Sequence, residues 1–146
     1  MQAPITLSDN TRTYILPAQR SSGAVRRCTD PAELAAIRFV QRLGIRPNLS
    51  GYQLLIRSIT TALNNPSLLG SLTHSLYPVV AEHHGCDVRA VERNIRRAID
   101  SAFEYDPERI RAIFYYKVDK PYISEVISLA VESIRYDNAY EGYMTE

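Results

Sequence analysis

The stretch that decides how this chain folds is Tyr77-Pro-Val-Val-Ala-Glu-His-His-Gly-Cys-Asp-Val-Arg-Ala-Val-Glu-Arg-Asn-Ile-Arg-Arg-Ala-Ile99. Its pattern indicates two helices joined by a sharp turn at Gly85, because glycine adopts positive φ without steric cost. Asp87 is a suitable N-cap for the second helix, which we predict to run from about residue 87 to residue 105. The stretch therefore predicts a helix-turn-helix.

When successive residues are placed about 100° apart around the helix axis, the second predicted helix has two contrasting faces. Its apolar residues fall on one side: Val88, Val91, Ile95, Ala98, Ile99 and Ala102. The opposite side carries Arg89, Glu92, Arg93 and Arg96, with Arg97 at its edge. Four arginines against one glutamate give this segment a local net charge of +3. Such a face is either the solvated side of an ordinary surface helix or a recognition surface for an anionic partner.

Bulk properties place the chain among globular proteins. Its 146 residues, 45% hydrophobic, suffice for one domain with a real core. The net charge is only +1, so any attraction to nucleic acid must be local to the arginine helix. Cys28 and Cys86 are too few for a disulfide framework, which predicts reduced thiols. With neither an apolar run of membrane-spanning length nor a signal core, we expect a cytoplasmic protein with no membrane contact.

The remaining signals are helical, and period-two alternation is nowhere sustained, so the predicted fold class is all-α. Residues 1–28 are expected to form a flexible basic arm or linker, since residues 12–27 hold four arginines and no acid. Whether that arm is a linker or a contact to the DNA backbone stays open. The helical domain is placed at residues 29–137, and residues 138–146 are expected to form a C-terminal tail without clear periodicity.

Two further helices can be outlined from their apolar residues. Asp30-Pro31 predicts a helix start and Gly44 the end of the first helix, with Leu34, Ile37, Val40 and Leu43 expected on its core side. The last helix, after Lys120-Pro121, has a continuous apolar stripe: Ile123, Val126, Ile127, Ala130, Val131 and Ile134.

Catalytic and metal chemistry find little support in the sequence. His83-His84-Gly-Cys86 resembles a ligand cluster, but no second pair of ligands accompanies it, so we expect no metal and no cofactor. Asp100 and Glu104 are better explained by i,i+4 pairing with Arg96 and Arg97 than by acid–base catalysis. The glycine-rich and nucleophile motifs of common enzymes are missing, so the protein is not expected to be an enzyme.

Three motifs carry a resemblance to a known family. The runs Leu68-Leu-Gly-Ser-Leu-Thr73, Leu76-Tyr-Pro78 and Val91-Glu-Arg-Asn-Ile-Arg-Arg-Ala-Ile99 resemble the C-terminal effector domain of the stage-zero sporulation response regulator, a phosphorelay-controlled transcription factor of endospore-forming bacteria. The similarity extends from about residue 31 to residue 137. It implies a compact six-helix domain whose helix-turn-helix reads a short double-stranded box similar to TGTCGAA.

The chain also departs from that family. The family protein begins with a phosphate-accepting receiver domain, and too few residues precede the first predicted helix to form one. The sequence is therefore interpreted as a receiver-less relative or a fragment. The connection from Tyr105 to Lys120 is shorter than in the family, where this neighbourhood helps to contact the polymerase sigma subunit. Asn94 replaces a small residue on the recognition helix.

The leading hypothesis is sequence-specific binding of double-stranded DNA, with a homodimer on tandem sites and the sigma subunit as further candidate partners. Arg89, Glu92, Arg93 and Arg96 are assigned to base edges, since arginine forks onto guanine and glutamate accepts from cytosine. The residues assigned to phosphates are Arg97, Asn94, Ser71 and Thr73. The alternative is a protein-interaction module, which would pair through Ile123, Val126 and Ile127 of its last helix and titrate a full-length regulator or a sigma factor.

Overall fold

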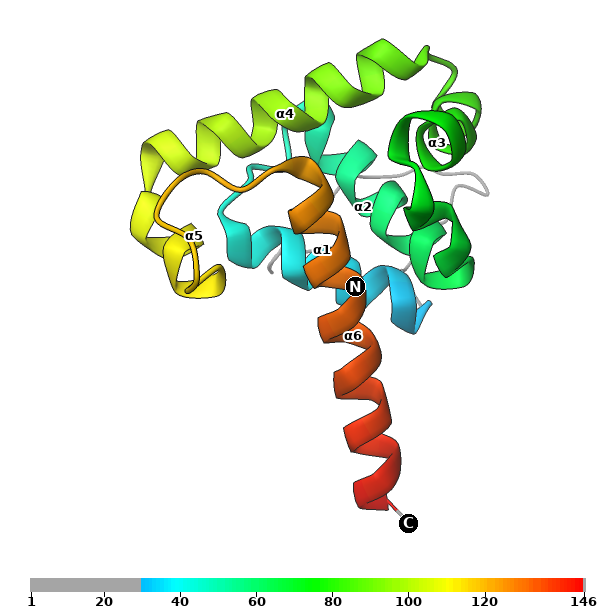
Figure 1. Cartoon of the computed structure of the whole chain (residues 1–146), viewed down its shortest axis with the longest axis vertical. Coiled ribbons are helices and arrows are strands. Elements are labelled where there is room, and N and C mark those ends of the chain that lie inside the picture. The colour runs from blue at the N-terminus through cyan, green and yellow to red at the C-terminus, as the bar shows by residue number, and fades with distance from the viewer. Residues whose placement is uncertain (1–29, 146) are drawn as a thin grey trace, which may run out of the picture.

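The computed structural model describes residues 30–145, with side chains to residue 137, and every regular element in this part of the chain is helical (Figure 1). The all-α prediction is confirmed, while the predicted basic arm lies outside the described residues. Six α-helices and two single turns follow one another: α1 (Pro31–Leu43), α2 (Ser50–Asn64), the 3₁₀ turn η1 (Pro66–Gly70), the π-helical turn η2 (Leu72–Leu76), α3 (Tyr77–His84), α4 (Val88–Tyr105), α5 (Pro107–Ile113) and α6 (Ile123–Thr145).

Helix α2 is the centre of the fold. Helices α1, α3, α4 and α6 all pack against it, and its side chains are buried around most of its circumference. Two of these side chains are polar, and both satisfy their hydroxyls locally. Ser58 Oγ donates to the Leu54 carbonyl at 2.8 Å, and Thr60 Oγ1 donates to the Arg57 carbonyl at 3.0 Å. The hydroxyls therefore lie in the interior without unpaired donors.

Helices α2 and α4 cross in direct backbone contact at Gly51. This glycine is buried, and a Cβ built on it would lie 2.7 Å from the Ala98 Cβ and closer still to the Asn94 carbonyl oxygen. Only glycine permits so close an approach. The position and tilt of α4 are thus set by a residue that lies outside the helix-turn-helix.

Helix α1 begins and ends as predicted, but its buried side differs from the expected one. The Ala32 amide donates to Asp30 Oδ1 at 3.1 Å, and Gly44 ends the helix with φ 89°. Leu34 is 36% exposed, so its assignment to the core side is wrong, whereas Ile37 is half-buried and packs against the core. The buried residues are Ala36, Phe39, Val40 and Leu43. Their i, i+3, i+4, i+7 spacing forms a tighter stripe than the predicted one.

The helix-turn-helix is built from α3, a three-residue turn and α4. The turn contains Gly85, with φ 69°, and the Cys86 amide donates back to the Ala81 carbonyl at 3.0 Å. The Ala90 amide donates to Asp87 Oδ1 at 2.7 Å, which confirms the predicted cap. Apart from Gly85 and its two chain neighbours, no described heavy atom lies within 4 Å of a Cβ built on Gly85. The turn therefore requires glycine for its left-handed backbone and not for lack of space.

We expect Gly85→Val to destabilise the domain by about 1–2 kcal/mol, the cost of a left-handed backbone for a residue that carries a Cβ. Gly85→Asn is the matched control, because asparagine tolerates this conformation better. Thermal unfolding measures both variants. An equal melting temperature for the valine variant and the wild-type protein would contradict the role given to this turn.

Helix α6 confirms the predicted stripe but is longer than expected. All six stripe residues from Ile123 to Ile134 are buried. The interaction-module alternative requires Ile123, Val126 and Ile127 to pair with another protein, and their burial makes them unavailable for this. The helix continues to Thr145, because extending an existing helix adds a backbone hydrogen bond for each residue that is fixed. None of the described helices is long and apolar enough to cross a membrane.

Candidate nucleic-acid interface

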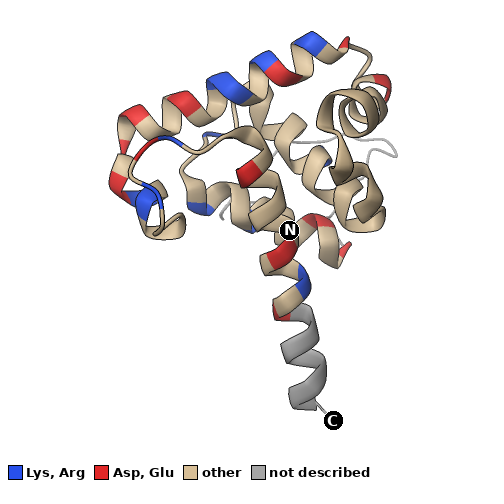
Figure 2. Ribbon diagram, viewed as in Figure 1, with Lys and Arg blue, Asp and Glu red and all other residues tan. Residues whose placement is uncertain are grey.

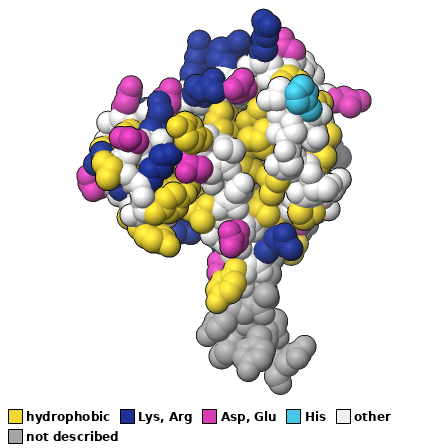
Figure 3. Space-filling view, viewed as in Figure 1, with side chains coloured by type: hydrophobic (Ala, Val, Ile, Leu, Met, Phe, Trp, Pro, Cys, Tyr) yellow, Lys and Arg dark blue, Asp and Glu magenta, His cyan; other side chains and the backbone are white. Residues whose placement is uncertain are grey.

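Helix α4 presents its arginines on the surface of the domain. Its apolar stripe is buried against the core except for the half-buried Val88, while the side chains of Arg89, Arg93, Arg96 and Arg97 are exposed. Figure 2 shows these basic residues along the N-terminal half of α4, and Figure 3 shows Lys and Arg side chains gathered over that end of the molecule. The predicted division into an apolar and a basic face is confirmed.

Only one of these arginines is held by a carboxylate. Arg96 Nη2 lies 2.7 Å from Glu92 Oε2, in a pair whose side chains are 55% and 43% exposed. Within the described part of the chain, Arg89, Arg93 and Arg97 form no ion pair. Their guanidinium groups are therefore not committed to the domain's own carboxylates.

The pairing predicted for Asp100 is wrong. Its carboxylate does not pair with Arg96 or Arg97 but lies 2.5 Å from Lys120 Nζ, in the segment that precedes α6. Arg96 instead pairs with the glutamate one turn earlier, which is the favourable orientation for an i,i+4 pair on a helix. The partner of Asp100 comes from a distant segment, so helix periodicity could not reveal it.

The candidate phosphate contacts differ in their surroundings. Ser71 caps η2, because the His74 amide donates to Ser71 Oγ at 3.2 Å, and Thr73 is exposed one residue into that turn. Arg97 is exposed on α4. Asn94 lies apart from the arginine row and is half-buried where α4 crosses α2 at Gly51.

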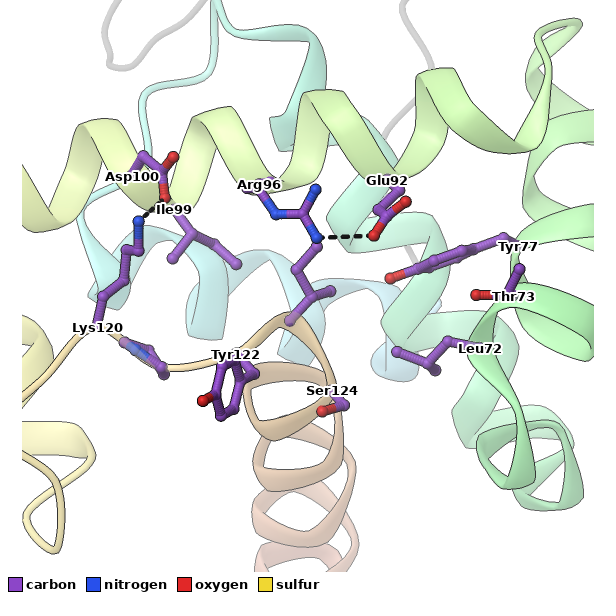
Figure 4. Close-up of a pocket in the computed structure, with 12 residues that line it drawn as sticks. Leu72, Thr73, Tyr77, Glu92, Arg96, Ile99, Asp100, Lys120, Tyr122 and Ser124 are labelled. Carbon is purple, nitrogen blue, oxygen red and sulfur yellow. Dashed lines mark hydrogen bonds and ion pairs between the residues drawn. The ribbon is translucent and has the colours of Figure 1, made fainter.

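A cavity of about 480 Å³ runs beside the arginine face (Figure 4). It brings Glu92 and Arg96 of α4 together with Thr73 of η2 and Tyr77 of α3, and with Lys120 and the start of α6. The structure thus places side chains from three assigned positions, Glu92, Arg96 and Thr73, around one hollow. Arg89, Arg93 and Arg97 do not line it.

Tyr77 is a residue of this site to which the sequence analysis assigned no role. Its ring is buried, and its phenol points into the cavity toward the Glu92–Arg96 pair (Figure 4). Burial raises the pKa of Tyr77, the Glu92 carboxylate adds to the rise and Arg96 opposes it, so that the pKa is about 12. The phenol is therefore neutral at physiological pH and can donate a hydrogen bond beside the pair.

The histidine and cysteine side chains near the turn do not gather into a ligand set. The rings of His83 and His84 lie edge to face with centroids 5.4 Å apart, and Cys86 is a free, exposed thiol. Among residues 30–137, no group of three or more His, Cys, Asp and Glu side chains is placed to hold a metal ion.

The α3–turn–α4 unit, with its exposed arginine face, places the protein in the helix-turn-helix class of domains. Comparison with protein families matches residues 36–134 to the family described as Sporulation initiation factor Spo0A C terminal, and this match spans more than half of the chain. The protein belongs to that family, whose members are DNA-binding transcription activator domains without enzymatic activity. The family resemblance drawn from the three motifs is confirmed, as is the compact six-helix fold.

Proposed function

We propose that this protein is a sequence-specific DNA-binding transcription regulator that inserts α4 into the major groove of double-stranded DNA. The observation that carries the proposal is the row of three exposed arginines with no ion pair to the described residues: Arg89, Arg93 and Arg97. Leaving guanidinium groups unpaired on a rigid helix favours an anionic partner that supplies the missing counter-charge.

Base recognition in this proposal is shared by four residues of α4. Arg89 and Arg93 each donate two hydrogen bonds from the guanidinium to guanine O6 and N7, the commonest specific contact to a base. Glu92 accepts from cytosine N4 while Arg96, bound to Glu92 at 2.7 Å, contacts the neighbouring base. A paired acid and base on adjacent turns suits a G–C step of the kind found in TGTCGAA.

Phosphate contacts position the domain on the duplex. We assign them to Arg97 at the edge of the face, to the hydroxyls of Ser71 and Thr73, and to Asn94. The Ser71 oxygen accepts a backbone hydrogen bond, which leaves its own hydrogen for a phosphate oxygen. Asn94 would reach a phosphate only from the α2 side of α4, because it is half-buried there.

A second candidate function is docking of a protein partner, such as a sigma subunit, beside α5. Tyr115, Val118 and Tyr122 are 87%, 72% and 70% exposed around the segment between α5 and α6. Such side chains are typical anchors of protein interfaces when they are exposed together. Tyr115 and Val118 do not line the cavity beside α4, whereas Tyr122 lines it together with Arg96.

Fluorescence anisotropy with a labelled TGTCGAA duplex and a scrambled duplex tests DNA binding. We expect tighter binding to the box, with log K falling by about 0.9 for each tenfold rise in salt per phosphate contact. Measurements between about 50 and 200 mM salt separate this from protein docking through apolar side chains, which responds weakly to salt. Equal binding of both duplexes, or none, would contradict the proposal.

A further inference from the structure

The Asp100 carboxylate lies on the arginine side of α4, one turn beyond Arg96. On a helix, residues four apart are neighbours, so Arg96 is within reach of two carboxylates. Glu92 lies one turn before Arg96, and Asp100 lies one turn after it. Only one of the two carboxylates pairs with Arg96 in the structure. Arg96 pairs with Glu92, and the charge of Asp100 is met by Lys120.

The Asp100 oxygen that faces Lys120 is shielded from solvent. Oδ1 is buried, and its ion pair with the Lys120 ammonium at 2.5 Å is the one contact to a charged group that it makes in the described chain. Loss of Lys120 would leave this oxygen without a cation, which is unfavourable even though the Asp100 side chain as a whole is 35% exposed. Arg96 lies four residues earlier on α4 and lines the same cavity, so it is within helical reach of Asp100.

We propose that Lys120 is a positioning residue for the DNA-binding face, which holds Asp100 away from Arg96 and cancels a negative charge at the C-terminal end of the arginine row. The inference rests on the proposed DNA-binding function. Lys120 comes from the segment between α5 and α6 and faces α4 across the cavity, as Figure 4 shows. Without Lys120, Asp100 would draw Arg96 from Glu92 and repel the approaching phosphates.

The test uses Lys120→Met in the full chain, with anisotropy on the TGTCGAA duplex. We expect DNA affinity to fall by about two- to five-fold, the usual effect of one partly exposed charge pair. The second change Asp100→Asn, made in the Lys120→Met background, should restore affinity because it removes the unpaired charge. A loss of packing at residue 120 would not be repaired in this way.

Lys117→Met is the charge-matched control. Lys117 lies in the same segment but pairs with Glu125 at 2.8 Å and does not line the cavity. It should leave DNA affinity within two-fold of wild type, with thermal unfolding reported for every variant. Unchanged affinity of Lys120→Met, or no rescue by Asp100→Asn, overturns the inference while wild-type binding stands. Absence of wild-type binding would overturn the proposed function and this inference together.

Discussion

Gly51→Ala is expected to destabilise the domain by about 1–3 kcal/mol, the range for overpacking a well-packed core. The added methyl group would meet the Asn94 carbonyl and the Ala98 methyl, so α2 and α4 would have to move apart. In an exposed helix the same change would stabilise by up to about 1 kcal/mol, because alanine has the higher helix propensity. A measured loss of stability therefore reports the crossing and not the local backbone preference. Urea unfolding followed by circular dichroism gives the free energy of unfolding.

Gly70→Ala is the matched control for this prediction. Gly70 ends η1, and a Cβ built on it has no described neighbour within 4 Å. The free energy of unfolding of Gly70→Ala should remain within about 0.5 kcal/mol of the wild-type value, the range for an ordinary surface change. If both alanine variants unfold alike, the backbone contact between α2 and α4 does not hold the recognition helix. If only Gly51→Ala is destabilised, the DNA affinity of this variant should also fall, because α4 moves away from its position against α2.

The parts of the fold that follow a local rule were predictable from the sequence. The α4 boundaries, its Asp87 cap and its two faces agree with the prediction, because capping and helical periodicity act within a few residues. The left-handed conformation of Gly85 was predictable for the same reason. In α1 the predicted stripe was only partly right, because the structure buries Phe39 and leaves Leu34 exposed.

Features that depend on tertiary contacts were not predictable. Gly51 has no role in the sequence analysis, because nothing near it in the chain indicates that α4 crosses there. The Lys120–Asp100 pair joins segments twenty residues apart, so local spacing suggested Arg96 or Arg97 instead. The cavity beside α4 and the inward phenol of Tyr77 likewise depend on how η2, α3 and α6 meet. The arginine row of α4 was thus predictable from the sequence, but the contacts that other segments make with it were not.

Arg93→Ala is expected to weaken binding to the TGTCGAA duplex by about 1–3 kcal/mol, the discrimination of one good bidentate base contact. The preference over scrambled DNA should decrease with it, because the lost contact is made only to the correct base. The variant should fold normally, since Arg93 is exposed and forms no ion pair with the described residues. Anisotropy titrations with both duplexes at one salt concentration measure the affinity and the preference together.

Arg97→Ala removes the same charge from the edge of the face, so it separates base recognition from general electrostatics. A phosphate contact carries no sequence information, and this variant should bind both duplexes more weakly by the same factor. Its salt dependence should also decrease by about 0.9 in slope, as one counterion fewer is released. The roles are wrongly assigned if Arg93→Ala keeps the wild-type preference or if Arg97→Ala loses it. Arg96→Ala is less informative for this purpose, because it also releases Glu92 from its ion pair.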